Sequence, residues 1–359
     1  MKPTARLHQL GQSLWLDNIT RTMLAEGVLQ GYIEELSVTG LTSNPTIFDK
    51  AISGGDAYDA QIAELTAAGS ADEQIFFELA LADLRDAADL FAGVHRRSDG
   101  VDGFVSLEVS PLLADDAAAT IAQAATLHAK AERENLFIKI PGTEAGRAAI
   151  EESIFAGIPV NVTLLFDDQQ YLGAAEAYMK GIERRIEAGL DPAVASVASI
   201  FMSRWDVAVA KEVSGELVNR LGIAVGGRVH RAYRELLDSD RWLRLMNEGA
   251  RPQRLLWAST GTKDPDASDT LYIEAFAAPF TVNTMPEPTL LAFADHGEVG
   301  ELFPPDGGNS EQVLKEFGTA GIDVAALAAR LQEEGKQSFN KSWEELLKSI
   351  ESQRGVAAS

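Results

Sequence analysis

Five polar side chains fall on one face of short apolar segments of the chain. Asp17 closes the segment SLWLD, Glu108 lies in VSLEV, Lys139 in LFIKI, and Asn161 and Thr163 in VNVTL. Because successive side chains of a strand point to opposite faces, the apolar residues of each segment lie on the other face. If the apolar faces pack beneath helices, all five polar side chains point into one interior. A lysine, two carboxyl groups, an amide and a hydroxyl are therefore predicted to meet there.

An interior lysine beside carboxyl groups has a definite chemistry. Burial disfavours the charged ammonium, and the neutral amine can attack a carbonyl carbon. The resulting iminium withdraws electrons, which permits cleavage or formation of the neighbouring carbon–carbon bond. Carboxyl groups can carry the protons that dehydration and cleavage require, and no histidine occupies these strand positions. Asp17, Glu108 and, through a water, Thr163 are therefore the candidate proton carriers for Lys139.

The competing interpretation is a structural ion pair that fills the interior. A lone buried Lys–Glu pair fits that interpretation about as well as a catalytic one, because structural ion-pair networks also perturb pKa values. Each unpaired buried polar group costs about 1–3 kcal/mol, however, and aliphatic side chains would fill the space without that cost. Polar groups on several strands, joined by Asn44 just past the second strand, therefore favour a functional site.

Segments with strand character alternate with helical stretches along the whole chain. The predicted strands are residues 13–17, 36–40, 104–110, 136–140, 160–166, 196–201, 254–259 and 280–284. The predicted helices between them include 20–35, 72–91, 115–134, 167–188, 204–221 and 227–247. This alternation predicts an α/β protein with a (β/α)8 TIM barrel and extra helices at the termini. An open doubly wound sheet is disfavoured, because no G-x-G-x-x-G follows the first strand.

The rest of the chain gives fewer signals. We predict one domain over residues 1–359, because no long linker or low-complexity segment divides the chain. The tail 322–350 is predicted to be a packing helix, with one apolar side made of Phe339, Trp343, Leu346, Leu347 and Ile350. Residues 53–69 and 303–309 are expected to be surface loops.

Composition excludes several classes of function. With 31 basic against 54 acidic residues, the net charge is −23, which disfavours nucleic acid or an anionic membrane as a partner. An anionic substrate would therefore need a local cluster of positive charge. The absence of cysteine excludes disulfides, thiolate metal sites and cysteine nucleophiles. The first residues lack the apolar core of a signal peptide, and the longest near-apolar run, 193–202, is too short to span a bilayer. We expect a cytoplasmic location.

Seven segments, in chain order, resemble those of the transaldolases. They are LWLDNITR (14–21), TGLTSNPTIF (39–48), SLEVSP (106–111), LFIKIPGTEAG (136–146), VNVTLLF (160–166), SIFMSRWD (199–206) and TVNTMPEPTLLAFADHG (281–297). Any one of them is weak evidence, because a strand carrying a lysine occurs in many barrels. Seven in order, from the first strand to the eighth, make the resemblance specific.

The resemblance implies roles for four catalytic residues. Lys139 matches the family's Schiff-base lysine, and Asp17 matches the acid/base that handles the substrate hydroxyl proton during carbon–carbon cleavage. Glu108 and Thr163 match the pair that holds and activates the catalytic water. No metal or organic cofactor is implied, since the lysine itself is the electron sink.

The same resemblance implies a set of substrate-binding residues. Asn44 and Asn161 match amides that bind the dihydroxyacetone hydroxyls, and Thr42 lies beside them. Ser199 and Phe201 match residues that line the sugar channel. Arg204 matches a phosphate-binding arginine.

The implied reaction transfers a three-carbon ketol unit from sedoheptulose 7-phosphate to glyceraldehyde 3-phosphate. The products would be erythrose 4-phosphate and fructose 6-phosphate, in the non-oxidative pentose phosphate pathway. The expected partners are sugar phosphates, and the sequence leaves monomer and homodimer both open.

The match breaks after the seventh predicted strand. Familiar transaldolases place a second phosphate-binding arginine there, in a Ser-Phe-Arg context, whereas this chain reads STGTKD over residues 259–264. Lys263 is the candidate replacement for this arginine, but its ammonium is a single point charge, whereas a guanidinium can donate two parallel hydrogen bonds to a phosphate. A solvated loop lysine is the alternative interpretation of Lys263.

Two other functions remain open on the sequence alone. A related Schiff-base aldolase would cleave a sugar phosphate and release dihydroxyacetone without transferring it. A sugar-phosphate-binding barrel without turnover would retain the fold but lack the chemistry, which the joint presence of Lys139, Glu108 and Asp17 disfavours.

Overall fold

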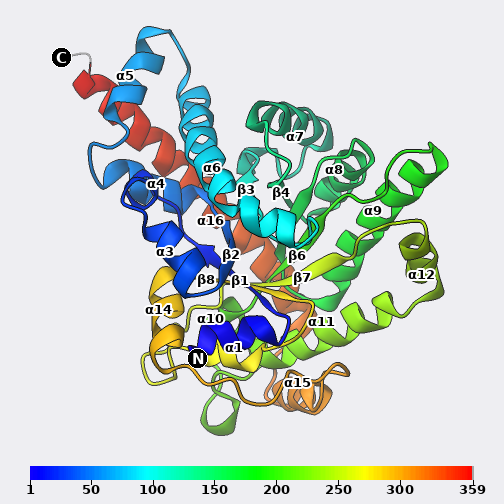
Figure 1. Cartoon of the computed structure of the whole chain (residues 1–359). Helices are drawn as coiled ribbons and strands as arrows, with labels where there is room; N and C mark the ends of the chain where they lie inside the picture. The colour runs from blue at the N-terminus through cyan, green and yellow to red at the C-terminus, as the bar shows by residue number, and fades with distance from the viewer. Residues whose placement is uncertain (358–359) are drawn as a thin grey trace.

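Eight parallel strands form the centre of the molecule in the computed structural model, which describes residues 1–357 (Figure 1). They are hydrogen-bonded in the order β2-β1-β8-β7-β6-β5-β4-β3. Two backbone hydrogen bonds of 3.0 Å join the two edge strands of this order, β2 and β3. They run from Leu41 N–H to Phe104 O and from Gly103 N–H to Thr39 O. The strands are β1 (Ser13–Asp17), β2 (Val38–Thr42), β3 (Val105–Glu108), β4 (Leu136–Pro141), β5 (Val160–Leu165), β6 (Ser196–Phe201), β7 (Gln253–Ala258) and β8 (Val282–Met285).

Helices surround the strands, as expected for a (β/α)8 barrel. The predicted extra helices at the termini are present as α1 and α16. The helices are α1 (Pro3–Gln9), α2 (Arg21–Ala25), α3 (Val28–Glu35), α4 (Pro45–Ser53), α5 (Asp59–Ala67), α6 (Asp72–Arg97), α7 (Ala117–Ala131), α8 (Glu144–Phe155), α9 (Asp168–Glu187), α10 (Ser203–Val209), α11 (Leu221–Leu237), α12 (Asp240–Asn247), α13 (Leu271–Ala275), α14 (Glu287–His296), α15 (Ser310–Thr319) and α16 (Val324–Ala357).

All eight predicted strands exist, but some of their ends differ. β2 begins and ends two residues later than predicted, which preserves the alternation of faces and brings Thr42 into the strand. In β5 the expectation for Leu164 is wrong. Its backbone has a φ of 58°, and the register of the β5–β6 pairing shifts between Val162 and Leu165. Leu164 therefore turns away from the outer helices and contacts α16 at Gly335.

Two predicted helices are each divided in two, and a third is cut short. Residues 20–35 break at Gly27, whose φ of 74° suits a residue without a Cβ. The predicted helix 204–221 is wrong beyond Val209, because α11 begins only at Leu221. Asp206 explains the break: its carboxylate accepts the Leu221 N–H at 2.9 Å, so a residue of α10 caps α11. The predicted helix 227–247 divides into α11 and α12.

The expectation of surface loops at 53–69 and 303–309 is wrong in part. Residues 59–67 form α5, which packs against α6 and α16. The 303–309 segment has no regular structure, but Phe303 anchors it. The Phe303 N–H donates to Ala277 O at 2.7 Å, and its ring lies 5.2 Å from the Phe276 ring, measured between centroids.

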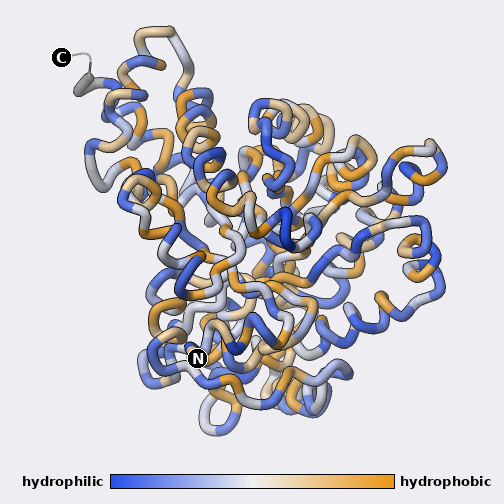
Figure 2. The backbone as a smooth tube through the Cα atoms, viewed as in Figure 1, coloured by the Kyte–Doolittle hydropathy of each residue, from blue (hydrophilic) through white to orange (hydrophobic). Residues whose placement is uncertain are grey.

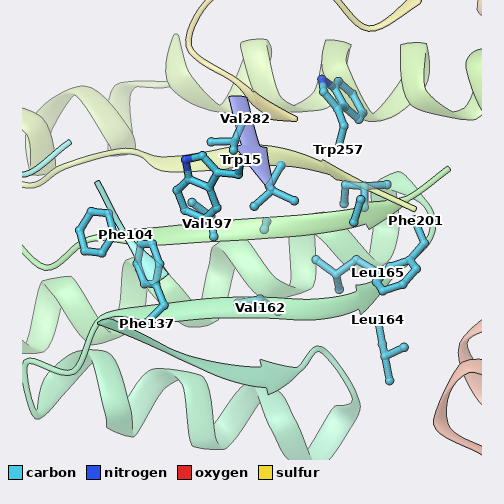
Figure 3. Close-up of a cluster of buried hydrophobic side chains, with 14 of the residues drawn as sticks. Trp15, Phe104, Phe137, Val162, Leu164, Leu165, Val197, Phe201, Trp257 and Val282 are labelled. Carbon is cyan, nitrogen blue, oxygen red and sulfur yellow. The ribbon is translucent and has the colours of Figure 1, made fainter. Parts of the chain in front are cut away.

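Large side chains fill the barrel interior toward the N-terminal ends of the strands. Trp15 and Phe137 have ring centroids 6.1 Å apart, and Phe137 stacks on Phe104 at 4.1 Å (Figure 3). The Trp15 Nε1–H donates to Asp102 at 2.8 Å. Figure 2 shows hydrophobic and hydrophilic stretches alternating along the outer helices. The cavity of the barrel lies at the opposite, C-terminal end of the strands. Of the helices described, none combines the length and apolar character needed to cross a membrane.

Gly40 supplies a test of this packing. A Cβ at Gly40 would lie 2.7 Å from Phe104 O and from the Trp15 ring, so Gly40→Ala should destabilise the fold by about 1–3 kcal/mol through overpacking. Urea unfolding measures the change. Gly31, inside α3, is the matched control because no atom lies within 4 Å of the added Cβ. Gly31→Ala should stabilise by roughly 0.5–1 kcal/mol. Equal behaviour of the two variants would contradict the packing described for Gly40.

Candidate active site

A cavity of about 310 Å³ opens at the C-terminal ends of the strands. This is the end at which barrels of this kind build their sites. The sequence predicts eleven site residues, and the cavity brings together all but Glu108 and Asn161. Those lining it are Asp17, Thr42, Asn44, Lys139, Thr163, Ser199, Phe201, Arg204 and Lys263. The two that do not line it contact residues that do.

Lys139 is buried, and its amine has two hydrogen-bond partners. Nζ lies 3.3 Å from Glu108 Oε2 and 3.3 Å from the carbonyl oxygen of Ser43. The strand register produces the first contact, because Glu108 of β3 pairs with Lys139 of β4. On its other side Lys139 pairs with Asn161 of β5. Neighbouring residues of a sheet on one face lie about 5 Å apart, so three polar groups converge without any long-range loop.

Asp17 lies across the cavity at the end of β1. Its Oδ1 accepts a hydrogen bond of 2.7 Å from Thr42, the residue with which it pairs on β2. Thr42 Oγ1 also lies 2.7 Å from Thr284 Oγ1. A hydroxyl has one hydrogen, so Thr284 donates to Thr42 when Thr42 donates to Asp17. Burial raises the pKa of Asp17, although the charge of Lys139 and the Thr42 bond oppose the rise.

Burial also raises the pKa of Glu108. The charge and hydrogen bond of Lys139 oppose the rise, and the nearby Asp17 carboxylate adds to it. Glu108 Oε1 and Thr163 Oγ1 are both buried, and neither has a hydrogen-bond partner among the described residues. Two such oxygens on β3 and β5 flank the lysine between them.

The amide residues are held by local hydrogen bonds. Asn161 donates to Ser106 Oγ at 3.1 Å and accepts from Ser199 Oγ at 2.7 Å, so β3, β5 and β6 are linked below the cavity. Asn44 is the N-cap of α4, and its side-chain oxygen accepts the Ile47 N–H at 3.1 Å. The cap occupies the amide oxygen and fixes the side chain at the cavity wall.

Besides Lys139, three cations line the cavity: Arg204 and Lys263 after β6 and β7, and Lys50 on α4. None of them forms an ion pair within the described part of the chain. Arg204 is partly buried, which lowers its pKa, and its guanidinium carbon lies 5.3 Å from the Phe201 ring centroid. Uncompensated positive charge is gathered here in a protein of net charge −23.

Sequence reasoning missed several cavity residues. Thr46, Ile47 and Lys50 come from α4, and Thr284 comes from β8. Their side chains carry no signal in strand periodicity, although the helical spacing of Thr46 and Lys50 places them on one face. The prediction of a tail helix that only packs is wrong. Helix α16 reaches the cavity and lines it with Ser338 and Phe339.

Comparison with known proteins identifies the family. The profile of the Transaldolase/Fructose-6-phosphate aldolase family matches residues 14–350. The transaldolase of Parafrankia sp. (strain EAN1pec) is 43% identical over 371 residues, covering all of both chains. That of Mycobacterium tuberculosis (strain H37Rv) is 44% identical over 364 residues, covering 99% of this chain and 98% of the relative. The chain belongs to the transaldolase family. The match extends to Saccharopolyspora erythraea, whose transaldolase is 44% identical over 354 residues.

Membership accounts for the arrangement at the mouth of the barrel. A transaldolase is a transferase of aldehyde or ketone residues, and its substrates are sugar phosphates. A buried amine flanked by carboxyl groups and a rim of unpaired cations suit both the chemistry and the charge of such substrates. Among the side chains described, no three of His, Asp or Glu are gathered as metal ligands.

Proposed function

We propose that this transaldolase carries a dihydroxyacetone unit as a Schiff base on Lys139. The donor is sedoheptulose 7-phosphate and the acceptor is glyceraldehyde 3-phosphate, in the non-oxidative pentose phosphate pathway of the cytoplasm. One observation carries the proposal: a buried amine lies 3.3 Å from a carboxylate, in a cavity that a second carboxylate lines. The seven ordered segments of the sequence agree with this assignment.

Schiff-base formation uses Lys139 and Glu108. The Lys139 nitrogen attacks the ketose carbonyl carbon, and the carbonyl oxygen takes up a proton to give a carbinolamine. Loss of that oxygen as water then forms the iminium. Glu108 and Thr163, each with a buried oxygen that lacks a hydrogen-bond partner among the described residues, hold this water. Glu108 moves the protons, because burial raises its pKa above the usual carboxyl range, which favours its acting as an acid as well as a base.

Cleavage of the carbon–carbon bond uses Asp17. Its carboxylate removes the proton of the hydroxyl on the carbon two positions from the iminium carbon, and the bond between that carbon and the intervening carbon breaks. The electron pair moves to the iminium nitrogen, an aldose phosphate leaves, and an enamine stays on Lys139. The acceptor aldehyde then takes the enamine carbon by the reverse steps, and water releases the new ketose. Thr42 holds Asp17 in position at 2.7 Å.

Substrate binding divides between the two sides of the cavity. Asn44 and Asn161 bind the hydroxyl groups of the three-carbon unit, and Ser199 and Phe201 line the channel that holds the sugar. Arg204 and Lys263 bind the phosphate. Because both cations follow neighbouring strands, one phosphate can contact both of them, with the Gly261 turn contributing flexible backbone beside Lys263.

The first prediction concerns the nucleophile. Borohydride reduction in the presence of fructose 6-phosphate should label Lys139 alone, because it is the only lysine on the interior face of the strands described. Lys139→Ala should remove both the label and turnover. Peptide mass mapping locates the modification. A label that survives the substitution, or maps to another lysine, would contradict the mechanism.

The second prediction concerns the proton carriers. Glu108→Gln should lower kcat by roughly 10²- to 10⁴-fold, because the amide cannot accept a proton. In the wild type, kcat should fall as the pH drops through the raised pKa of Glu108, so the acid limb lies above the ordinary range near pH 4.3. Rate profiles against pH measure both effects.

The Asp17→Asn variant distinguishes the role of Asp17 from that of Glu108. It should slow carbon–carbon cleavage in a single turnover more than it slows trapping of the Schiff base. Cleavage at the wild-type rate in this variant would refute the role of Asp17.

The third prediction concerns the phosphate. A hydrogen bond to a charged group contributes about 1.5–3 kcal/mol, so Arg204→Ala should raise KM for phosphorylated donors at least about tenfold. Lys263→Ala should act in the same direction but less, and Lys263→Arg should be tolerated. Steady-state kinetics with fructose 6-phosphate and with unphosphorylated fructose measure the difference.

The KM for unphosphorylated fructose should hardly change in the Arg204 and Lys263 variants. Lys180→Ala, at an exposed position of α9, is the matched loss of one positive charge and should leave KM unchanged. If Lys263→Ala behaves like Lys180→Ala, the second phosphate contact lies elsewhere, and Lys50 is then the remaining cation of the cavity.

A further inference from the structure

Helix α16 lies across the mouth of the barrel and is fastened on both sides of it. Near its start, the Gln332 amide donates to the carbonyl oxygen of Leu164, on β5, at 2.9 Å. Farther along, Ser342 is hydrogen-bonded to Thr46 of α4 at 2.8 Å, and Ser349 donates to Asp49 at 2.7 Å. In Figure 1 the orange-to-red helix runs from the barrel outward to α4 and α5. The helix therefore spans the cavity between two fixed points.

Gly335 allows the helix to approach the strands closely. A Cβ at this position would lie 2.9 Å from Leu164 Cδ2 and 3.7 Å from Arg204 Nη1. Glycine inside a helix costs roughly 0.5–1 kcal/mol relative to alanine. At Gly335 the absence of a side chain allows close contact with Leu164 of β5 and with Arg204.

Phe339 follows Gly335 by one helical turn, so it lies on the same face. Its ring centroid is 5.6 Å from Lys139 Nζ and 6.4 Å from the Phe201 ring centroid, and the residue is only 7% exposed. A cation within about 6 Å of an aromatic face is attracted to it. Two aromatic rings, one from β6 and one from α16, thus form an apolar wall beside the amine.

An apolar wall beside Lys139 affects the fate of the enamine that cleavage leaves on this residue. After cleavage, the enamine carbon is a nucleophile that can add to an acceptor aldehyde, which gives transfer. It can instead take a proton from water; hydroxide then adds to the iminium carbon, the carbon–nitrogen bond breaks, and dihydroxyacetone leaves. Excluding water from a reactive intermediate suppresses such a side reaction.

We propose that Phe339, held over Lys139 by α16, determines that the three-carbon unit is transferred to an aldehyde instead of being released to water. This rests on the Schiff-base function proposed above. It assigns to the C-terminal helix a part in reaction specificity, through a side chain that supplies no proton and no hydrogen bond. What it supplies is bulk and an aromatic face at the amine.

The test compares release with transfer. With fructose 6-phosphate as donor and saturating erythrose 4-phosphate as acceptor, the ratio of free dihydroxyacetone to the transfer product, sedoheptulose 7-phosphate, is measured. Phe339→Ala should raise this ratio at least about tenfold, or about 1.4 kcal/mol in relative barrier height. Phe339→Val, which removes less bulk, should raise it less and guards against loss of the fold. Phe339→Met should restore a ratio near that of the wild type, because methionine refills the space.

Trp343 provides the matched control on the same helix. It lies one turn beyond Phe339, fully buried against Phe76 with ring centroids 5.0 Å apart, and it does not line the cavity. Trp343→Phe should lower thermal stability while leaving the release ratio unchanged. An unchanged ratio in both Phe339→Ala and Phe339→Val overturns the proposal. So does an equal rise in Trp343→Phe, which would assign the effect to docking of the whole helix.

Borohydride labelling separates the two proposals. If wild-type Lys139 is not labelled, the Schiff-base function itself fails. If Lys139 is labelled equally in the wild type and the Phe339 variants while the ratio stays constant, only the role of Phe339 fails.

Discussion

The structure depends on keeping an amine and two carboxyl groups together out of water. Moving such groups from water into a protein costs several kcal/mol each unless they are paired. Here Lys139 contacts Glu108 and a backbone carbonyl, and Asp17 contacts Thr42, so each group keeps at least one partner. The pKa values of both carboxyls are nevertheless raised by burial. The site holds groups that are poised to exchange protons because the surroundings do not fully satisfy their charge.

The barrel meets this requirement through strand register. Glu108 pairs with Lys139, which pairs with Asn161, while Asp17 pairs with Thr42. A slip of one residue in any of these strands would turn its polar side chain to the opposite face. Large side chains such as Trp15 and Phe137 fill the interior beneath the site and resist such a slip, since a close-packed core tolerates little change of volume.

Strand alternation alone predicted Asp17, Glu108, Lys139, Asn161 and Thr163, whereas most of the other site residues came from the resemblance to transaldolases. The alternation of strand side chains between two faces, which placed Lys139, Glu108 and Asp17 inside, can be read from local sequence alone. The two-residue displacement of β2 does not change which of its side chains face the interior, because two residues are the period of a strand. The alternation failed at Leu164, where a positive φ breaks the period. It could not reach Asp206, whose capping of a second helix is a tertiary contact, nor Phe339, whose helical face is apolar whether it meets a core or a cavity. Roles that depend on contacts between distant segments carry no local signal.

The position of α16 in the chain has a consequence for biosynthesis. The eight strands emerge from the ribosome before this helix, and folding of a nascent chain begins with its N-terminal part. The barrel can therefore pair its strands and bury its lysine while the mouth is still uncovered. The cavity is completed only when the helix docks, so a nascent or prematurely terminated barrel would leave the Lys139 amine open to small carbonyl compounds in its surroundings. Chain order thus makes the formation of the fold and the covering of its buried amine two separate events.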